Sequence, residues 1–430
     1  MEMLILGGRV IDPARGLDET LDIRIADGRI AAIGRFETEG GTDEHRIDAR
    51  GCVVAPGLID THVHFRDPGF THKEDLETGA AAAQRGGFTT VVCMANTKPV
   101  VDNPATLADI LARGARTGIH ILQASSVTRG MAGEELVDMT AMRDAGAAGF
   151  TDDGLPILRT ALLREAMTRA AALGRPISLH EEDPTLIAQN GIHAEIAERM
   201  GLRGAPAVAE DLLVARDCAL ALDTGARVVV QHISSGRAVE IVRFARARGA
   251  DVWAEATPHH FSLTQKALLE HGTSAKMNPP LRTEWDRMRI VEGLADGAIA
   301  LIASDHAPHT AAEKAMPLDK APSGIIGLET SLALGVTNLV RKGHLTLPAL
   351  LEKMTAAPAA AYRLPYGTLA PGAPADLVVF DPDEEWTVSS FASKSANSPF
   401  AGQRLFGRVR HTVCGGSVVY SAGAAPTRMS

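Results

Sequence analysis

The chain has 430 residues, and its 43 basic and 52 acidic residues give a formal net charge of −9 with neutral histidine. A dedicated nucleic-acid binder needs a basic stripe, so this balance argues against a nucleic-acid partner, although a few arginines can still bind a small anion. Hydrophobic residues make up 45% of the chain, enough to bury a large core, which excludes a disordered protein.

The sequence carries no signal for a membrane or an oxidising compartment. No stretch reaches the roughly 18 uninterrupted apolar residues of a membrane helix, and no basic segment precedes the short apolar run at the N-terminus. The four cysteines are scattered and form no CxxC motif, which favours reduced, mostly buried thiols. We therefore expect a cytoplasmic protein without a membrane partner.

The two ends of the chain resemble each other and differ from the middle. In residues 1–55, apolar runs flank Asp27-Gly28, a pair that signals a hairpin. Residues 363–430 contain three similar short apolar runs, at Asp376–Phe380, Val409–Val413 and Ser417–Tyr420. Neither end is large enough for a stable sheet of its own, so we predict one small β-sandwich domain built from both. The alternative is two independent sheets packed on the centre.

Residues 56–362 alternate between short apolar runs and stretches of helical character. Helices are expected at Lys73–Arg85, Ala105–Arg116, Arg159–Leu173, Ala207–Leu222, Gly236–Arg248 and Glu284–Leu294. Strands are expected at Gly57–Phe65, Thr89–Ala95, Ile119–Ala124, Ala147–Thr151, Pro176–Leu179, Ala226–Gln231, Ala250–Ala256 and Ala298–Ala303. Eight strands alternating with helices predict an α/β fold, a (β/α)8 TIM-type barrel. An open doubly wound sheet would more often carry a Gly-rich phosphate fingerprint, which is missing here.

Histidine and aspartate follow the predicted strands, at the mouth where barrels of this kind build active sites. His62 and His64 are two residues apart, so in a strand both imidazoles face one side and can reach one ion. Further candidate ligands end other strands: Asp153, His180, His232 and Asp305. Nitrogen and oxygen donors without a thiolate suit catalytic zinc. Six ligands exceed one tetrahedral ion and indicate two metals bridged by a carboxylate, with a single zinc as the alternative.

The motifs around these residues resemble a known family. The segment Gly57-Leu-Ile-Asp60-Thr-His62-Val-His64 resembles the signature of the amidohydrolase superfamily. Its continuation and three later motifs are similar to type I bacterial dihydroorotases: Phe65-Arg66-Asp67-Pro68-Gly69, Asn96-Thr97, Lys276-Met-Asn278-Pro-Pro280 and Ser304-Asp305-His306-Ala-Pro-His309. Hydantoinases and allantoinases carry a carboxylated lysine at strand four, where this sequence has Asp152-Asp153, as type I dihydroorotases do. Such cyclic amidases are the nearest alternative, and Arg66 beside the histidine pair also disfavours them.

The resemblance implies roles for individual residues. It places one zinc on His62, His64 and Asp305 and a second on His180 and His232. It makes Asp153 the bridge between them, with Asp152 as the fallback, and Asp305 the general acid/base, a task suited to a carboxylate. A guanidinium fork matches a carboxylate, so Arg66 is expected to bind that group of the substrate. The implied substrate contacts are His64, Arg66, Asn96, Asn278, His309, Ser323 and Gly324.

The implied activity is zinc-dependent, reversible cyclisation of N-carbamoyl-L-aspartate to L-dihydroorotate and water, in de novo pyrimidine biosynthesis. A homodimer and association with aspartate transcarbamoylase are further family expectations. A non-catalytic scaffold for the transcarbamoylase is the alternative from another class, disfavoured because all six metal ligands are kept. The sequence departs from the family pattern at Ala95, Glu181 and Ser323, where Pro, Cys and Phe are common. Ser323 belongs to Thr310–Ile326, a long segment with Gly and Pro hinges that is expected to cover the substrate.

Overall fold

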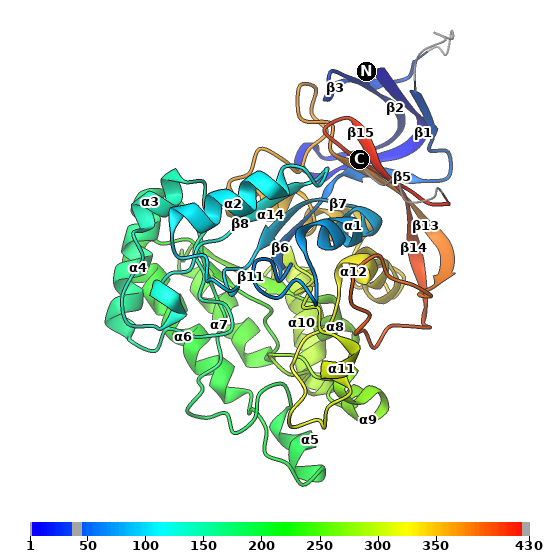
Figure 1. The fold of residues 1–430 in the computed structure, drawn as a ribbon. Helices are drawn as coiled ribbons and strands as arrows, with labels where there is room; N and C mark the ends of the chain where they lie inside the picture. The colour runs from blue at the N-terminus through cyan, green and yellow to red at the C-terminus, as the bar shows by residue number, and fades with distance from the viewer. Residues whose placement is uncertain (1, 37–44, 424–430) are drawn as a thin grey trace.

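The computed structural model describes residues 2–36 and 45–423. Its centre is a ring of parallel strands: β6 (Leu58–Val63), β7 (Phe88–Cys93), β8 (His120–Gln123), β9 (Ile177–Leu179), β10 (Val228–Val230), β11 (Val252–Ala256) and β12 (Leu301–Ile302). They form two sheets, β6-β7-β8 and β12-β11-β10-β9. Phe150 joins these sheets on one side through parallel bridges to Ser125 and Ile177. On the other side Val63 pairs with His306, so the ring closes into a barrel. In Figure 1, β6, β7, β8 and β11 lie among the helices.

The predicted strand at Ala147–Thr151 is wrong as a regular strand. Of this segment, Phe150 alone makes strand-type bridges, whereas the seven other predicted strands are all present with shorter bounds. The segment opens with Ala147-Ala148-Gly149, residues of low strand propensity, and the larger Phe150 is the residue that pairs. The fourth position of the barrel is therefore a single bridging residue, and the two aspartates follow shortly after it.

Helices cover the outside of the ring. The six predicted helices are confirmed: α1 (Leu76–Gly86), α2 (Pro104–Gly114), α4 (Thr160–Leu173), α6 (Val208–Thr224), α7 (Gly236–Ala247) and α10 (Glu284–Asp296). The others are α3 (Met139–Asp144), α5 (Ala194–Arg199), α8 (Pro258–Ser262), α9 (Ala267–His271), α11 (Ala311–Lys314), α12 (Leu328–Gly335), α13 (Leu347–Glu352) and α14 (Ala356–Tyr362). Side-chain caps fix several starts; Asp75 and Thr78, for example, form a reciprocal capping box at α1.

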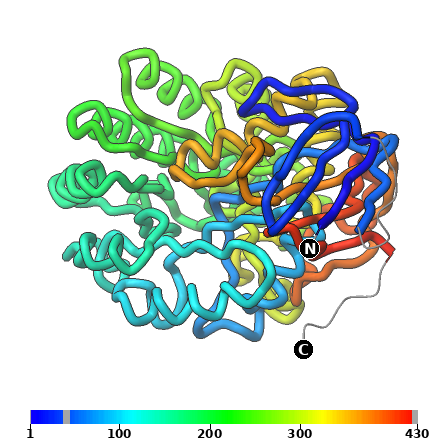
Figure 2. Tube along the Cα trace, turned by 90° about the horizontal axis from the view of Figure 1, so that it is seen from above, coloured from blue at the N-terminus to red at the C-terminus, as the bar shows by residue number. Residues whose placement is uncertain are grey.

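Both ends of the chain build one further sheet. Its strands are β1 (Glu2–Asp12), β2 (Leu17–Ala26), β3 (Arg29–Gly34), β4 (His45–Asp48), β5 (Val53–Pro56), β13 (Leu377–Thr387), β14 (Arg404–Cys414) and β15 (Ser417–Ser421). The N-terminal and C-terminal strands join where β13 runs antiparallel to β5, with Leu377 opposite Pro56. Figure 2 shows the two terminal segments, blue and red, lying side by side beside the barrel.

The pairing of β13 with β5 excludes the alternative of two independent sheets. The sheet encloses its own apolar core, which includes Ile5, Ile23, Ile25 and Val379, and the fold is a TIM-type barrel with a β-sandwich domain from the termini. The predicted hairpin is confirmed between β2 and β3, where Asp27 has φ 50° and Gly28 φ 73°. Positive φ at both turn residues is the geometry that favours Asp-Gly. The domain limits at 55/56 and 362/363 stay a prediction.

Within residues 2–36 and 45–423, no helix is long and apolar enough to cross a bilayer. All four cysteines are free thiols, and three of them are buried, while Cys52 is partly exposed. Their burial agrees with the prediction of mostly buried thiols.

The contact between α1 and α12 allows a stability prediction. An alanine Cβ at Gly86 would lie 2.3 Å from the carbonyl oxygen of Leu328, which is backbone and yields little. We expect Gly86→Ala to lower the free energy of unfolding by about 1–3 kcal/mol, the usual cost of overpacking. Urea denaturation measures this, with exposed Glu77→Ala in the same helix as the control. An unchanged midpoint for Gly86→Ala would show that the two helices separate without cost.

Candidate metal centre and active-site cavity

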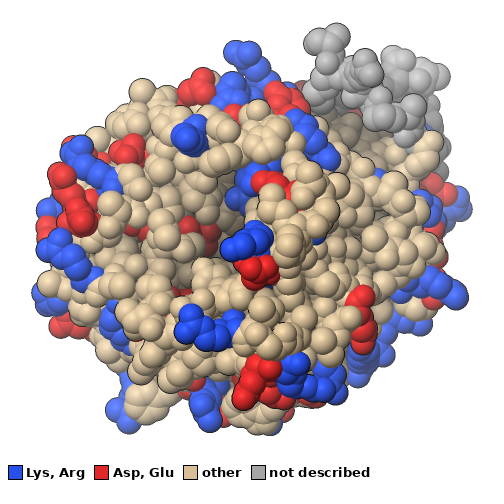
Figure 3. All heavy atoms as spheres, turned by 60° about the horizontal axis from the view of Figure 1, so that its bottom comes forward, with Lys and Arg blue, Asp and Glu red and all other residues tan. Residues whose placement is uncertain are grey.

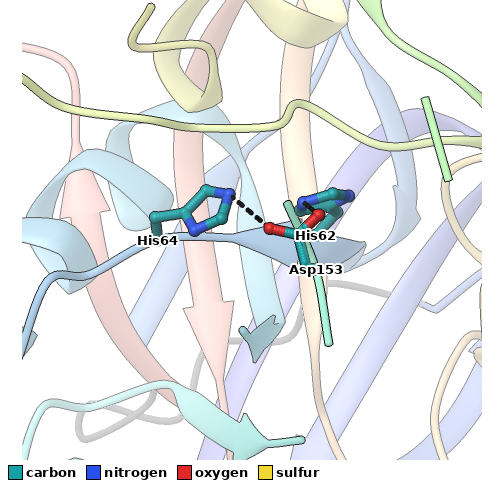
Figure 4. A group of neighbouring side chains, drawn as sticks. All are labelled: His62, His64 and Asp153. Carbon is teal, nitrogen blue, oxygen red and sulfur yellow. Dashed lines mark ion pairs between the residues drawn. The ribbon is translucent and has the colours of Figure 1, made fainter. Parts of the chain in front are cut away.

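The first ligand group lies at the end of β6. His62 and His64 alternate along the strand with Val63 between them, so both rings point to the barrel mouth. Asp153 lies between the rings: its Oδ1 is 3.4 Å from His62 Nε2 and its Oδ2 is 3.5 Å from His64 Nε2 (Figure 4). Asp305 completes the group, with Oδ1 at 3.2 Å from His64 Nε2 and 3.6 Å from His62 Nε2.

The second group shares Asp153 with the first. His180, just after β9, and His232, after β10, bring Nδ1 and Nε2 to within 3.0 Å of each other. Asp153 Oδ1 is 4.0 Å from His180 Nδ1 and 3.6 Å from His232 Nε2. The six side chains predicted as ligands are therefore all brought together, and all six are buried. Two groups of side chains that meet at Asp153 are consistent with a binuclear metal site.

The backbone is strained at this mouth. Arg66, His232 and Asp305 have φ values of 60°, 32° and 46°, in the left-handed region that L-residues other than glycine rarely adopt. Such conformations cost of order 1–3 kcal/mol each and persist where the surrounding structure enforces them, mainly at functional sites. The strain thus falls on three of the residues to which sequence analysis gave a role.

The electrostatics of the cluster are those of opposite charges held close together. Burial alone would raise the pKa of Asp153, but the adjacent His62, His232 and His64 hold it well below its usual range. Asp305 is likewise buried, yet His64 and His62 keep its pKa low. The pKa of His62 is raised well above its usual value, because Asp153, Glu255 and Asp305 outweigh its burial. Both aspartates are therefore ionised and able to bind a cation.

The ring nitrogens of the cluster fit a metal ion. Nε2 of the buried His62 faces Asp153 and Asp305 and has no hydrogen-bond partner in the structure. Buried polar atoms are nearly always paired, so an unpaired nitrogen that faces carboxylates calls for a ligand. Imidazole and carboxylate donors without a thiolate suit zinc and related divalent ions. The donor set and the unpaired nitrogen together fit the predicted metal centre.

A cavity of about 380 Å³ opens beside the cluster. It is lined by every residue predicted to contact substrate: His64, Arg66, Asn96, Asn278, His309, Ser323 and Gly324. Figure 3 brings this face forward and shows a hollow in it. In the coloured part of that surface, Lys and Arg are interspersed with Asp and Glu and form no continuous basic stripe.

Arg66 lines the cavity next to His309. Its NH2 is 3.4 Å from His309 Nε2, and its Nε donates to the Pro308 carbonyl over 3.3 Å. Among the described residues, no carboxylate forms an ion pair with this guanidinium. Burial, together with the cations Arg66 and Lys73, lowers the pKa of His309 to about 3, so its ring is neutral. A partly buried guanidinium with a neutral imidazole beside it is a site for an anionic group.

The predicted covering segment closes the cavity through Ala321, Pro322, Ser323 and Gly324. Two buried lysines hold this segment. Lys276 Nζ donates to the carbonyls of Leu318 (2.8 Å) and Ala321 (2.6 Å), and Lys314 Nζ to those of Pro322 (3.0 Å) and Gly324 (2.9 Å). The carbonyl of Ser323, rather than its side chain, meets His309 Nε2 at 2.9 Å. The serine that replaces the family's phenylalanine therefore contributes a backbone contact.

Comparison with known proteins accords with this site. Residues 51–238 match the family model described as dihydro-orotase-like. The chain is 57% identical over 421 residues to the dihydroorotase of Clostridioides difficile (strain 630), covering 98% of this chain and 100% of the relative. It is 50% identical over 425 residues to that of Lactococcus lactis (strain IL1403), again covering 98% and 100%. The chain belongs to the dihydroorotase family.

Solved structures with other names share the fold of this dihydroorotase-family chain. The L-hydantoinase from Arthrobacter aurescens matches with a TM-score of 0.89 and 28% identity, over 99% of this chain and 97% of that one. The dihydropyrimidinase from Brevibacillus agri matches with a TM-score of 0.85 and 23% identity, over 98% and 95%, which shows a shared fold. The matches extend over the barrel and the β-sandwich of this chain, so both solved structures share its whole fold.

The geometry separates Asp152 from Asp153, the two aspartates that follow the bridging residue Phe150. The Asp152 carboxylate turns away from the cluster: its Oδ1 accepts from the amides of Val127 (2.8 Å) and Thr128 (3.1 Å). Burial raises its pKa to about 6. This favours Asp153 over Asp152 as the bridging residue of this dihydroorotase-family site. Glu181 is another position at which the sequence departs from the family pattern. It is buried beside Asp217, and both its burial and the Asp217 carboxylate raise the pKa of Glu181 well above its usual value.

Three residues of the site were missed by sequence analysis as site residues. Glu255, in β11, is fully buried with Oε2 3.5 Å from His62 Nδ1. Glu182 faces His180, with Oε2 3.3 Å from Nε2, and Lys276 lines the cavity. A signal for Glu255 was present, because it is a lone carboxylate in the apolar run Val252-Trp-Ala-Glu-Ala. A charge within a buried strand is rare unless it has a partner.

Proposed function

We propose that this chain is a dihydroorotase that catalyses the reversible cyclisation of N-carbamoyl-L-aspartate to L-dihydroorotate and water. The observation that carries the proposal is that one cavity joins the His/Asp cluster to Arg66 and His309. The substrate has an amide to be opened or closed and a carboxylate to be held. The cavity presents a group for each.

The proposed metal ligands are the six buried residues His62, His64, Asp153, His180, His232 and Asp305, with zinc as the ion and two ions per chain. When bound, such ions polarise a carbonyl oxygen and make water a stronger acid. The fit rests on the unpaired Nε2 of His62 and on the position of Asp153 between both groups. A single zinc ion per chain is the alternative occupancy.

Asp305 is the proposed acid/base. Its carboxylate lines the cavity and is ionised, so it is able to accept a proton. In the hydrolytic direction, water adds to the ring carbonyl and Asp305 takes its proton. The carboxylic acid then passes that proton to the ring nitrogen as the C–N bond breaks. In the direction of cyclisation the same steps run in reverse, and water leaves.

Arg66, Asn96 and His309 are proposed to hold the substrate carboxylate and so to place the amide carbonyl over the cluster. Holding the reacting groups in place lowers the entropic part of the activation barrier. The same contacts supply selectivity against neutral hydantoins, which would leave Arg66 without a counter-charge. Asn96 also donates to Asp153 Oδ2 (3.1 Å) and meets His64 Nδ1 (3.0 Å), which links the substrate side of the cavity to the cluster.

Several further properties belong to the proposal. We infer a cytoplasmic homodimer that is able to associate with aspartate transcarbamoylase. A chain with all six ligands in place is an unsuitable candidate for a purely structural subunit. The domain limits at 55/56 and 362/363 are kept as proposed.

Removal of metal tests the function. We expect the zinc-loaded protein to hydrolyse dihydroorotate, to lose this activity on chelation and to regain it with zinc. Hydantoin and allantoin, assayed in parallel, should turn over far more slowly because they lack the carboxylate that Arg66 binds. Ultraviolet absorbance follows the ring opening. Full activity in the chelated protein, or a preference for hydantoin, would contradict the proposal.

A further inference from the structure

We propose that Glu255 and Glu182 are positioning residues, each of which holds one metal-binding histidine by its outer ring nitrogen. Glu255 would hold His62 and Glu182 would hold His180, one histidine from each of the two ligand groups. The inference rests on the ligand set given under the proposed function and extends it from the ligands to the residues behind them.

Glu255 is aimed at His62 from across the barrel. It lies in β11, fully buried, and its Oε1 accepts a hydrogen bond from Thr61 Oγ1 at 2.5 Å, which fixes the carboxylate. The other oxygen, Oε2, is 3.5 Å from His62 Nδ1, slightly beyond an ordinary hydrogen bond. Neither of these two atoms has another hydrogen-bond partner. They are therefore available to each other, while His62 Nε2 faces Asp153 and Asp305.

Glu182 has the same relation to His180. Its side chain is 2% exposed, and neither of its oxygens has a hydrogen-bond partner in the structure. Oε2 is 3.3 Å from His180 Nε2, and Arg282 NH2 lies 3.7 Å from the other oxygen. His180 Nδ1 faces the opposite way, toward His232 and Asp153. The inner nitrogen of the ring thus faces the cluster. The outer nitrogen lies beside the Glu182 carboxylate, and Asn278 Nδ2 is 3.4 Å from the same ring atom.

The other two histidines lack such a carboxylate. His64 Nδ1 meets the amide oxygen of Asn96 at 3.0 Å, and His232 Nδ1 has no partner in the described structure. Each ligand group therefore contains one histidine backed by a buried carboxylate. A carboxylate that accepts the outer N–H fixes the tautomer and orientation of the ring and makes the inner nitrogen a stronger donor. This also explains why two costly buried carboxylates have oxygens without other partners.

The test compares Glu255→Gln and Glu182→Gln, which keep side-chain shape and remove charge. The matched control is Glu74→Gln: Glu74 is buried and lies 3.2 Å from Nε2 of His306, a histidine outside the proposed ligand set. Zinc affinity is measured by competition with a chelator. We expect each single glutamine variant to weaken zinc affinity in one of the two binding steps by about 10- to 100-fold. The double variant should weaken zinc affinity in both steps, and Glu74→Gln should leave both unchanged.

Cadmium-113 NMR supplies a second readout that needs no activity. The cadmium-loaded protein should give two resonances, of which Glu255→Gln shifts mainly one and Glu182→Gln mainly the other. If Glu255→Gln fails to fold, Thr61→Val replaces it, because this variant removes the hydrogen bond that aims Glu255 while leaving the carboxylate. A smaller loss of affinity in the same step is then expected.

The outcomes separate the two proposals. Two bound metals with unchanged affinities and unshifted resonances in both glutamine variants would overturn the positioning role and leave the proposed function standing. A wild-type protein that binds no metal, or a His62→Ala variant that binds both ions normally, would overturn the ligand set and with it the proposed function.

Discussion

Asp305→Asn is expected to reduce kcat for dihydroorotate hydrolysis by about 100- to 10,000-fold, the range that general acid–base groups contribute. The amide has nearly the shape of the carboxylate, but it is unable to accept a proton from water. The wild-type carboxylate is ionised throughout the physiological pH range, because His64 and His62 hold its pKa low despite its burial. Initial rates at saturating substrate measure the effect.

The metal content of this variant must be measured alongside its rate. Asp305 Oδ1 is 3.2 Å from His64 Nε2, so the substitution also weakens the proposed ligand set. Rates are therefore compared at equal zinc occupancy. Asp223→Asn is the control, because Asp223 is exposed and pairs only with Arg164 among the described residues. An Asp305→Asn protein with full zinc and an unchanged kcat would remove Asp305 from the acid/base role.

Arg66→Ala is expected to raise KM for dihydroorotate by about 10- to 150-fold. A charge-assisted hydrogen bond is worth roughly 1.5–3 kcal/mol, and each 1.4 kcal/mol is about a factor of ten. Since no carboxylate of the described chain pairs with Arg66, its loss leaves no protein charge uncompensated and acts mainly on substrate binding. Steady-state kinetics measure KM and kcat separately.

A second substrate makes this prediction specific. Dihydrouracil has the same ring without the carboxylate, so Arg66→Ala should change its kcat/KM little. Arg66→Lys keeps the charge without the two-pronged fork and should fall between the alanine variant and the wild type. Equal losses on both substrates would mean that Arg66 supports the structure of the site instead of binding the carboxylate.

The candidate site was more predictable from the sequence than some of the secondary structure. Ligands at strand ends follow from topology: parallel strands in a barrel bring their carboxyl ends to one mouth, so His62, His180, His232 and Asp305 had to lie near one another. The choice of Asp153 over Asp152 as the bridging ligand came from the resemblance to the family. The structure adds a physical reason, because the Asp152 carboxylate accepts hydrogen bonds from two backbone amides.

What the sequence did not reveal depends on contacts between distant segments. Glu255 and His62 come from strands far apart in the chain. The sequence around Glu255 does not show which histidine ring its buried carboxylate faces. Ser323 contributes its carbonyl to His309, a role that residue identity does not encode. The segment Ala147–Thr151 was predicted as a strand because it is one of the short apolar runs, but Phe150 alone pairs. The alternation of apolar runs with helical stretches predicts how many strand positions the barrel has. It does not predict how many residues pair at each position.

The junction of β5 with β13 has a consequence for the order of folding. Leu377, the residue opposite Pro56, is made only after the whole barrel has been synthesised. Until then β5 presents an open strand edge, the kind of surface on which chains aggregate. Synthesis therefore places the closing of the terminal sheet last. A circularly permuted chain that begins shortly before β13 and joins the old termini would make this sheet first.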